Sequence, residues 1–136
     1  MERSLVICKP DSVERGLAGQ ILSRLEAKGL KLVAAELRVI DAGLAAQLYA
    51  EHAKRGFYAD LVAFIGRSPS LVCVVEGPVD TWQIVRRLMG ATNPAEANAG
   101  TIRGDMASTV SANLVHGSDS GTAALREIAI FFPKLG

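Results

Sequence analysis

Only two histidines occur in the chain of 136 residues, and His116 is the one placed for chemistry. It ends the apolar run Leu114-Val115 and is followed at once by Gly117-Ser118-Asp119-Ser120-Gly121. We expect His116 at the end of a strand, facing small and polar residues that open a helix. Backbone amides at such a turn suit an anion. The spacing alone also allows a histidine that packs at a strand edge and is hydrogen-bonded locally.

Basic side chains elsewhere could serve the same anion site. Arg103 is flanked by glycines in Gly100-Thr101-Ile102-Arg103-Gly104-Asp105, and its alternative is a loop ion pair with Asp105. Arg86 and Arg87 lie on an expected helix, where one could point inward, although two solvated arginines are commoner. Lys9 directly follows an expected buried strand and precedes a proline; its alternative is a surface lysine with a buried stem.

Other site chemistries find little support in the sequence. The phosphate-binding patterns G-x-x-x-x-G-K-[ST] and G-x-G-x-x-G are absent, as is G-x-S-x-G. We interpret Gly16-x-x-Gly19 as a turn and His52 as a solvated surface residue. Cys8 and Cys73 sit inside apolar runs without a C-x-x-C pattern, which predicts two buried free thiols in a reducing cytosol.

Length and charge restrict the class of protein further. A chain of 136 residues predicts one domain over 1–136, and 49% apolar residues can supply its core. Fifteen Lys and Arg against 14 Asp and Glu give a net charge of +1, which argues against binding nucleic acid or an anionic membrane by bulk charge. The longest apolar candidate, Leu71 to Val75, is far short of the roughly 20 residues that span a bilayer. We therefore expect a cytoplasmic protein with no membrane or nucleic-acid partner.

The elements that must position these residues follow from periodicity and caps. Strands are expected at Ser4–Cys8, Lys31–Ile40, Leu71–Val75 and near Asn113–Val115. Helices are expected at Gly19–Lys28, from Asp41 through Leu48, from Phe57 to Gly66, from Asp80 or Thr81 to Gly90, and from Ser118 or Ser120 to Phe131. Residues 91–105 are expected to form a loop. This order predicts a ferredoxin-like α/β sandwich with a four-stranded antiparallel sheet covered by helices, and a small doubly wound sheet is the alternative.

Residues 113–120, Asn-Leu-Val-His-Gly-Ser-Asp-Ser, resemble the N-x-x-H-G-S-D signature of the nucleoside diphosphate kinases. The order and spacing of further segments are also similar to that family, so the resemblance covers essentially the whole chain. These segments are Lys9-Pro10-Asp11, Arg15-Gly16-Leu17, Gly90-Ala91-Thr92-Asn93-Pro94, Gly100 to Asp105, Arg126-Glu127-Ile128 and Phe131-Phe132. The resemblance implies a ferredoxin-like fold and transfer of a γ-phosphate from a nucleoside triphosphate to a nucleoside diphosphate. It also implies two half-reactions through a phosphohistidine.

The resemblance implies catalytic roles at matched positions. His116 would be the nucleophile, Glu127 would orient its imidazole, and Ser120 would support that contact. Tyr49 would stand close to His116. Asp119 is interpreted as a helix cap or an ion-pair partner. Mg²⁺ would be bound through the nucleotide phosphates, with no direct metal ligand from the protein.

The resemblance also assigns the nucleotide contacts. The phosphates would be held by Lys9, Arg86, Thr92 and Arg103, and the sugar hydroxyls by Lys9 and Asn113. Phe57 would stack on the base, with Leu61 and Val110 completing an apolar clamp that tolerates every base. Because Arg103 stands in an expected loop, we expect its removal to cost about 1 kcal/mol of stability or less.

The implied partners are nucleoside diphosphates, nucleoside triphosphates and further copies of the chain. A hexamer is favoured, in which the segment Gly90 to Arg103 meets its copies around a threefold axis. The sequence closes at Phe132-Pro133-Lys134-Leu135-Gly136, without the longer tail of eukaryotic members, so a tetramer stays open. Two other hypotheses are a non-enzymatic ferredoxin-like module that binds nucleotide or nucleic acid, and a catalytically silent paralogue.

Overall fold

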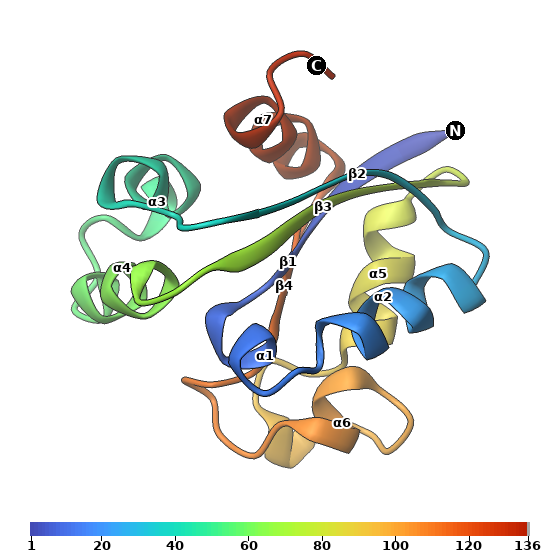
Figure 1. The fold of residues 1–136 in the computed structure, drawn as a ribbon, viewed down its shortest axis with the longest axis horizontal. Helices are drawn as coiled ribbons and strands as arrows, with labels where there is room; N and C mark the ends of the chain where they lie inside the picture. The colour runs from blue at the N-terminus through green and yellow to red at the C-terminus, as the bar shows by residue number, and fades with distance from the viewer. Residues whose placement is uncertain (136) are drawn as a thin grey trace.

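The computed structural model describes residues 1–135 and contains a four-stranded antiparallel sheet in the order β2-β3-β1-β4 (Figure 1). The strands are β1 (Glu2–Cys8), β2 (Lys31–Arg38), β3 (Ser70–Gly77) and β4 (Val115–Gly117). β1 pairs with both β3 and β4, and β2 pairs with β3 at one edge. The predicted α/β fold with a four-stranded antiparallel sheet is confirmed, and the doubly wound alternative is wrong.

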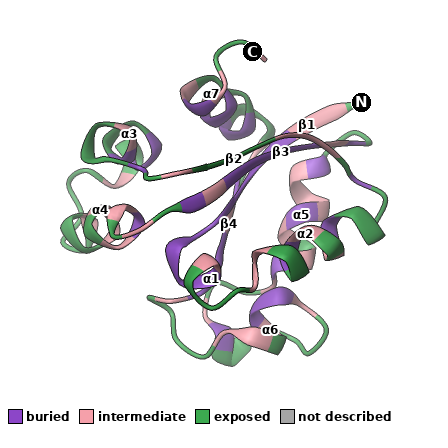
Figure 2. Cartoon of the chain, in the orientation of Figure 1, coloured by how far each residue is buried: buried purple, intermediate pink, exposed green. Residues whose placement is uncertain are grey.

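Side chains alternate across the central strand and divide the core into two clusters. Val6 and Cys8 pack on one face with helices α2 (Ala18–Ala27) and α5 (Thr81–Met89). Leu5 and Ile7 pack on the other face with α3 (Ala42–Leu48), α4 (Tyr58–Gly66) and α7 (Gly121–Phe131). Burial therefore follows the middle of the sheet and the inner sides of the helices (Figure 2), as a period of two on strands requires.

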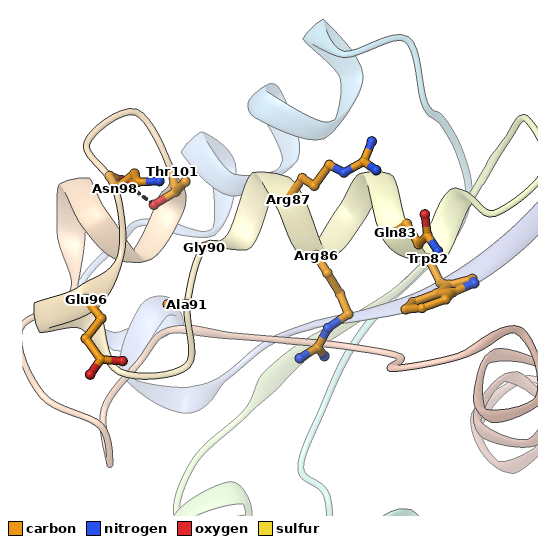
Figure 3. A pocket seen from close by; sticks show the side chains of 9 residues that line it. All are labelled: Trp82, Gln83, Arg86, Arg87, Gly90, Ala91, Glu96, Asn98 and Thr101. Carbon is orange, nitrogen blue, oxygen red and sulfur yellow. Dashed lines mark hydrogen bonds between the residues drawn. The ribbon is translucent and has the colours of Figure 1, made fainter.

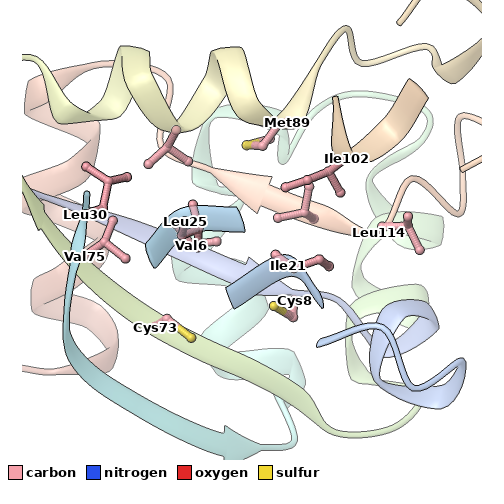
Figure 4. Packing of buried hydrophobic residues seen from close by; sticks show 12 residues of the cluster. Val6, Cys8, Ile21, Leu25, Leu30, Cys73, Val75, Met89, Ile102 and Leu114 are labelled. Carbon is pink, nitrogen blue, oxygen red and sulfur yellow. The ribbon is translucent and has the colours of Figure 1, made fainter. Parts of the chain in front are cut away.

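Both cysteines lie in the first of these clusters (Figure 4). Cys8 and Cys73 are free and fully buried, as predicted. Burial raises the pKa of each thiol above its ordinary value. The thiols therefore behave as small apolar side chains rather than as nucleophiles.

Three short helices lie where the sequence predicted none. α1 (Pro10–Glu14) begins directly after β1, and the 3-10 turn Pro94–Glu96 and α6 (Ile102–Met106) interrupt the expected loop 91–105. Local side-chain caps explain two of them: the Asn93 side chain accepts from Ala95 N and the Thr101 hydroxyl accepts from Gly104 N. Within residues 1–135, no helix combines the length and apolar character that a membrane span needs.

The strand that carries the histidine begins later than predicted. Leu114 has a left-handed backbone with φ 75°, which keeps it out of the ladder, so β4 starts at Val115 instead of Asn113. His116 accordingly lies in the middle of β4 and pairs with Ile7. Gly117 then passes so close to α5 that a Cβ there would lie 2.5 Å from Met89 Sδ. A larger residue at this crossing would require the Met89 side chain to move, so glycine allows β4 to pack closely on α5 beside His116.

Candidate active site

Two hollows in the surface contain residues singled out by the sequence. A cleft of about 250 Å³ lies where α3, α7 and β4 meet, and a shallower hollow of about 700 Å³ lies along α5. Figure 3 shows the larger hollow, with Arg86 and Arg87 pointing to opposite sides of α5. The smaller cleft is lined by Leu48, Tyr49, Glu51, His52, Arg86, Thr92, His116, Gly117, Asp119, Arg126 and Glu127. It is the candidate active site because it gathers the histidine, its carboxylate and cationic side chains.

A buried carboxylate holds the imidazole at the floor of the cleft. His116 Nε2 lies 2.8 Å from Glu127 Oε1, and the Ser118 hydroxyl donates to the same oxygen at 2.9 Å. Burial raises the pKa of Glu127, but hydrogen bonds and charge from His116, with Ser118 and Arg126, outweigh it and leave that pKa below its ordinary value. Because the carboxylate is ionised and only accepts, Nε2 must donate. The lone pair of the neutral ring therefore sits on Nδ1.

The serine that supports this contact differs from the one predicted. Ser120 does not touch Glu127; its side chain caps α7 by accepting from Ala123 N at 2.9 Å. The contact belongs to Ser118, which is fully buried. The extended residue directly before a helix is the N-cap position, so the Ser120 hydroxyl is already committed to the backbone. Ser118 precedes α7 and donates to Glu127, which lies on that helix.

Tyr49 and Arg126 complete the walls beside this pair. Tyr49 lines the cleft with His116 as predicted, and burial followed by the charge of Glu127 raises its pKa to about 12. Arg126 Nη2 lies 3.7 Å from Glu127 Oε2, and Arg126 Nη1 donates to Gln47 O on α3. The phenol therefore remains neutral in the physiological range. The carboxylate accepts from His116 and Ser118 on one oxygen and has the Arg126 guanidinium beside the other.

Lys9 and Asn113 do not line the cleft, but they are linked to it through Thr92. Lys9 Nζ donates to Asn113 Oδ1 at 2.8 Å, and Asn113 Nδ2 donates to Thr92 O at 3.1 Å. Burial lowers the pKa of Lys9 to about 8, partly opposed by the charge of Asp11 and reinforced by that of Arg103. These predicted site residues are therefore joined into one hydrogen-bonded group.

Arg103 is a structural cation as well as a candidate ligand. Its guanidinium donates to three carbonyls, those of Gly90, Asn113 and Val115, and the residue is only 5% exposed. Burial, with the charge of Arg86, lowers its pKa to about 10. The loop ion pair considered from the sequence is wrong, because Asp105 binds Arg24 instead. The expectation that removing Arg103 costs about 1 kcal/mol of stability or less is also corrected, because the side chain is buried and bonded to three carbonyls.

The two neighbouring arginines of α5 point in different directions, and the sequence analysis allowed that one of them points inward. Arg86 Nη1 donates to Gly117 O at 3.0 Å and lines the cleft. Arg87 is exposed and lines the larger hollow. One arginine thus stands beside the histidine while its neighbour in sequence does not.

The three residues predicted to clamp a base are not among those that line the cleft. Phe57 is 45% exposed and Val110 is 53% exposed, while Leu61 packs on the apolar core below. His52 corrects an expectation: it lines the cleft, and its ring lies 6.4 Å from that of Tyr49 and 5.6 Å from that of Phe57. It belongs to a 3-10 turn, Ala50–His52, and this turn aims it inward instead of to solvent.

Carboxylates that could bind a metal directly are sparse here. Among residues 1–135, no group of three or more His, Cys, Asp or Glu side chains is arranged to hold an ion. Asp119 and Glu51 are exposed at the cleft mouth, and the Glu127 carboxylate is occupied by His116 and Ser118. The side chains present fit a metal whose oxygen ligands come mainly from a bound phosphate compound.

Comparisons with known proteins agree over nearly the full length. A family model described as "Nucleoside diphosphate kinase" matches residues 2–135. A nucleoside diphosphate kinase from Corynebacterium diphtheriae is 53% identical over 137 residues, covering 98% of each chain. A halophilic nucleoside diphosphate kinase from Halobacterium salinarum, solved in complex with CDP, is 48% identical with a TM-score of 0.93, over 96% of this chain and 87% of that one. A family protein from Babesia bovis has a TM-score of 0.94 at 45% identity, over 98% and 90%.

Proposed function

The chain belongs to the nucleoside diphosphate kinase family, and from this premise we propose that His116 carries the phosphoryl group between two nucleotides. The activity transfers the γ-phosphate of a nucleoside triphosphate to a nucleoside diphosphate. The enzyme class predicted from the sequence is confirmed, so the non-enzymatic alternatives are set aside. The observation that carries the proposal is the bond from His116 Nε2 to Glu127, which leaves Nδ1 free in the cleft.

In the first half-reaction, Nδ1 attacks the γ-phosphorus of the triphosphate. The N–P bond forms as the bond from phosphorus to the bridging oxygen breaks, and the diphosphate leaves with that electron pair. Glu127 offsets the positive charge that develops on the ring through the Nε2 hydrogen bond. In the second half-reaction a terminal phosphate oxygen of the acceptor diphosphate attacks the same phosphorus, and Nδ1 regains its lone pair.

Transition-state charge is handled by side chains already fixed in the structure. Arg86 is held by Gly117 O, directly beside His116, and Lys9 and Arg103 are buried near it. We assign these cations, with Thr92, to the phosphate oxygens. Because the protein has already oriented them, they stabilise charge without reorganising during the reaction, which is the main catalytic task in phosphoryl transfer.

We assign the sugar and the base of the nucleotide to two further groups of residues. Lys9 and Asn113 are joined by a hydrogen bond and offer a donor and an amide to the ribose hydroxyls. Phe57, Leu61 and Val110 supply an apolar clamp with no side-chain donor or acceptor for a base edge. The CDP complex of the Halobacterium salinarum relative supports nucleotide binding with a small base.

Mg²⁺ and self-assembly complete the proposal. Mg²⁺ bound to the nucleotide phosphates would neutralise charge on the transferred group, while Lys9, Arg86 and Arg103 hold the remaining oxygens. A homo-oligomer, with a hexamer favoured over a tetramer, would place the segment Gly90–Arg103 at a threefold axis. Support comes from the exposure of this segment between Ala95 and Gly100 and of the edge strand β2.

Labelled ATP tests the nucleophile. The protein should acquire an acid-labile, alkali-stable phosphate, and His116→Ala should lose both the label and at least about 10⁴-fold in kcat. His52→Ala, which removes the other histidine, is the matched control and should retain the label. A label that survives in His116→Ala, or that lies on Ser118 or Ser120, contradicts the proposal.

A further inference from the structure

Asp11 is a buried carboxylate that the proposed chemistry does not use. It lies in the first turn of α1, two residues after Lys9, and is 4% exposed. One oxygen, Oδ2, accepts from the backbone N–H of Leu114 at 3.0 Å, 103 residues away in the sequence. The other oxygen, Oδ1, is buried with no hydrogen-bond partner. A carboxylate kept in such a place costs free energy, so its presence calls for a function.

The peptide that Asp11 holds is unusual for its residue type. Leu114 adopts φ 75°, a left-handed conformation that an L side chain rarely takes and that persists only where neighbours fix it. Both of its backbone polar groups are fixed by the same turn: its N–H donates to Asp11, and its carbonyl accepts from Lys9 N at 2.9 Å. The end of β1 and the start of α1 therefore hold Leu114 from two sides.

The Leu114 peptide connects two parts of the site. On one side is Asn113, whose side chain binds Lys9 and Thr92 O and whose carbonyl accepts from Arg103. On the other side β4 begins, and His116 follows two residues later. A rotation at Leu114 would move the group that meets the sugar relative to the nucleophile.

We propose that Asp11 is a positioning residue for phosphoryl transfer, which fixes the Leu114 peptide and so sets Lys9 and Asn113 relative to His116. The inference rests on the proposed function. Asp11 acts through its hydrogen bond from Leu114 N and through its charge on Lys9.

The charge of Asp11 has its own consequence. Two charged groups face Lys9: Asp11 from α1 and Arg103 from α6. The ammonium also lies over the ring of Phe64 from α4, and the Arg67 guanidinium lies over the same ring. Burial and Arg103 favour the neutral amine, and Asp11 is the anion that opposes them. Removing this charge lowers the pKa of Lys9 further below about 8, so the ammonium is lost at a lower pH.

Asp11→Asn separates charge from geometry, because the amide oxygen can still accept from Leu114 N. We expect the alkaline limb of the kcat/KM profile to move to lower pH by about one unit, with a deficit of about twofold near neutrality that grows towards about tenfold above pH 8. Asp11→Ala also frees the Leu114 peptide and should lose a further factor, about tenfold, at every pH. NMR titration of ε-labelled Lys9 should move with the alkaline limb.

Asp105→Asn is the matched control. Asp105 also accepts a backbone N–H, from Gly100 at 2.9 Å, but it pairs with Arg24 outside the cleft. Its profile should keep the native alkaline limb. An Asp11→Asn protein that melts like the native one and keeps the native limb and Lys9 titration overturns the proposal.

Asp11→Glu keeps the test decisive if the amide variant does not fold. It retains the charge and displaces the oxygen, so the limb should stay in place while turnover falls at all pH values. Native turnover in Asp11→Glu contradicts the positioning role. Failure of the proposed function would give a different result, because the protein without any substitution would then acquire no phosphate on His116.

Discussion

The two sides of the nucleotide site differ in how far their side chains are held in place by the protein itself. We call the side of β4, α6 and α7 the built side, and the side assigned to the base the open side. On the side of β4, α6 and α7, Glu127, Arg103 and Asn113 are buried and bonded to fixed partners. On the side that is assigned to the base, Phe57 and Val110 are about half exposed and carry no side-chain polar group. Developing charge needs dipoles and cations that are already oriented, whereas stacking needs only a flat apolar face. We therefore assign the fixed side chains to phosphoryl transfer and the exposed apolar side chains to recognition of the base.

The largest effect should come from the carboxylate beside the nucleophile. Glu127→Gln keeps the shape but removes the charge and presents either an amide oxygen or an amide nitrogen to His116. We expect kcat to fall about 10³–10⁴-fold, by analogy with neutralising the carboxylate of a catalytic triad. Rapid-quench kinetics of His116 phosphorylation measures this step directly.

The pH dependence of that loss distinguishes it from the Asp11 variant. Because the pKa of Glu127 is below its ordinary value of 4.5, the carboxylate is fully ionised from pH 6 to 9. The deficit of Glu127→Gln should therefore be constant over this range, while that of Asp11→Asn grows with pH. A Glu127→Gln deficit that varies tenfold across the range would show that another group shares its role.

Arg103 should show the next largest effect, in rate and in stability together. Arg103→Met removes the guanidinium donor from three carbonyls, those of Gly90, Asn113 and Val115, of which the last two lie in the interior. Bonds from charged donors contribute roughly 1.5–3 kcal/mol each and do not add fully, so we expect a loss of about 2–4 kcal/mol. The rate should fall about 10²-fold. Thermal unfolding and steady-state kinetics measure the two quantities.

Arg87→Met is the matched control for this substitution. Arg87 has the same side chain on the same side of the sheet but is exposed and points away from Arg86 (Figure 3). Its removal should change stability by less than about 0.5 kcal/mol and leave kcat unaltered. Equal effects in the two variants would contradict the division between the built and the open side.

The sequence predicted the parts of the fold that local pattern determines. The continuous apolar runs of β1 and β3, the helix caps at Asp41 and at Ser118 or Ser120, and the stops at Gly66 and Gly90 all have local causes. α1 and the late start of β4 depend on contacts between distant segments. Leu114 takes its left-handed conformation because Lys9 and Asp11 hold it, and no pattern around residue 114 indicates this.

Site residues divide in a similar way. The resemblance to a family named His116, Glu127, Lys9 and Arg86, and the structure brings His116, Glu127 and Arg86 to one cleft. The role of Ser118 was missed because either serine could cap a helix, and a difference of two residues in where the helix starts decides which hydroxyl is left for Glu127. His52 was missed because its turn is 3-10 rather than α-helical, which rotates the ring inward. Burial of Arg103 required knowing that three carbonyls converge on it.

The smallest effect should come from the open side. Phe57, Leu61 and Val110 offer no hydrogen bond to a base edge, and a stacked ring accepts every base because each has a π-face. ADP, GDP, CDP and UDP should therefore differ in kcat/KM by about tenfold to a hundredfold, with purines ahead through stacking area. Phe57→Ala should lower kcat/KM about tenfold for all four acceptors and compress these differences, since stacking on one aromatic contributes ~1–3 kcal/mol. Leu125→Ala, which removes an exposed apolar side chain from α7, is the control and should change none of them. The measurement is competition of the four diphosphates for phosphorylated enzyme. A thousandfold preference for one base, or a Phe57→Ala loss confined to one base, requires a polar group that reads the base edge and would place recognition on the built side of the cleft.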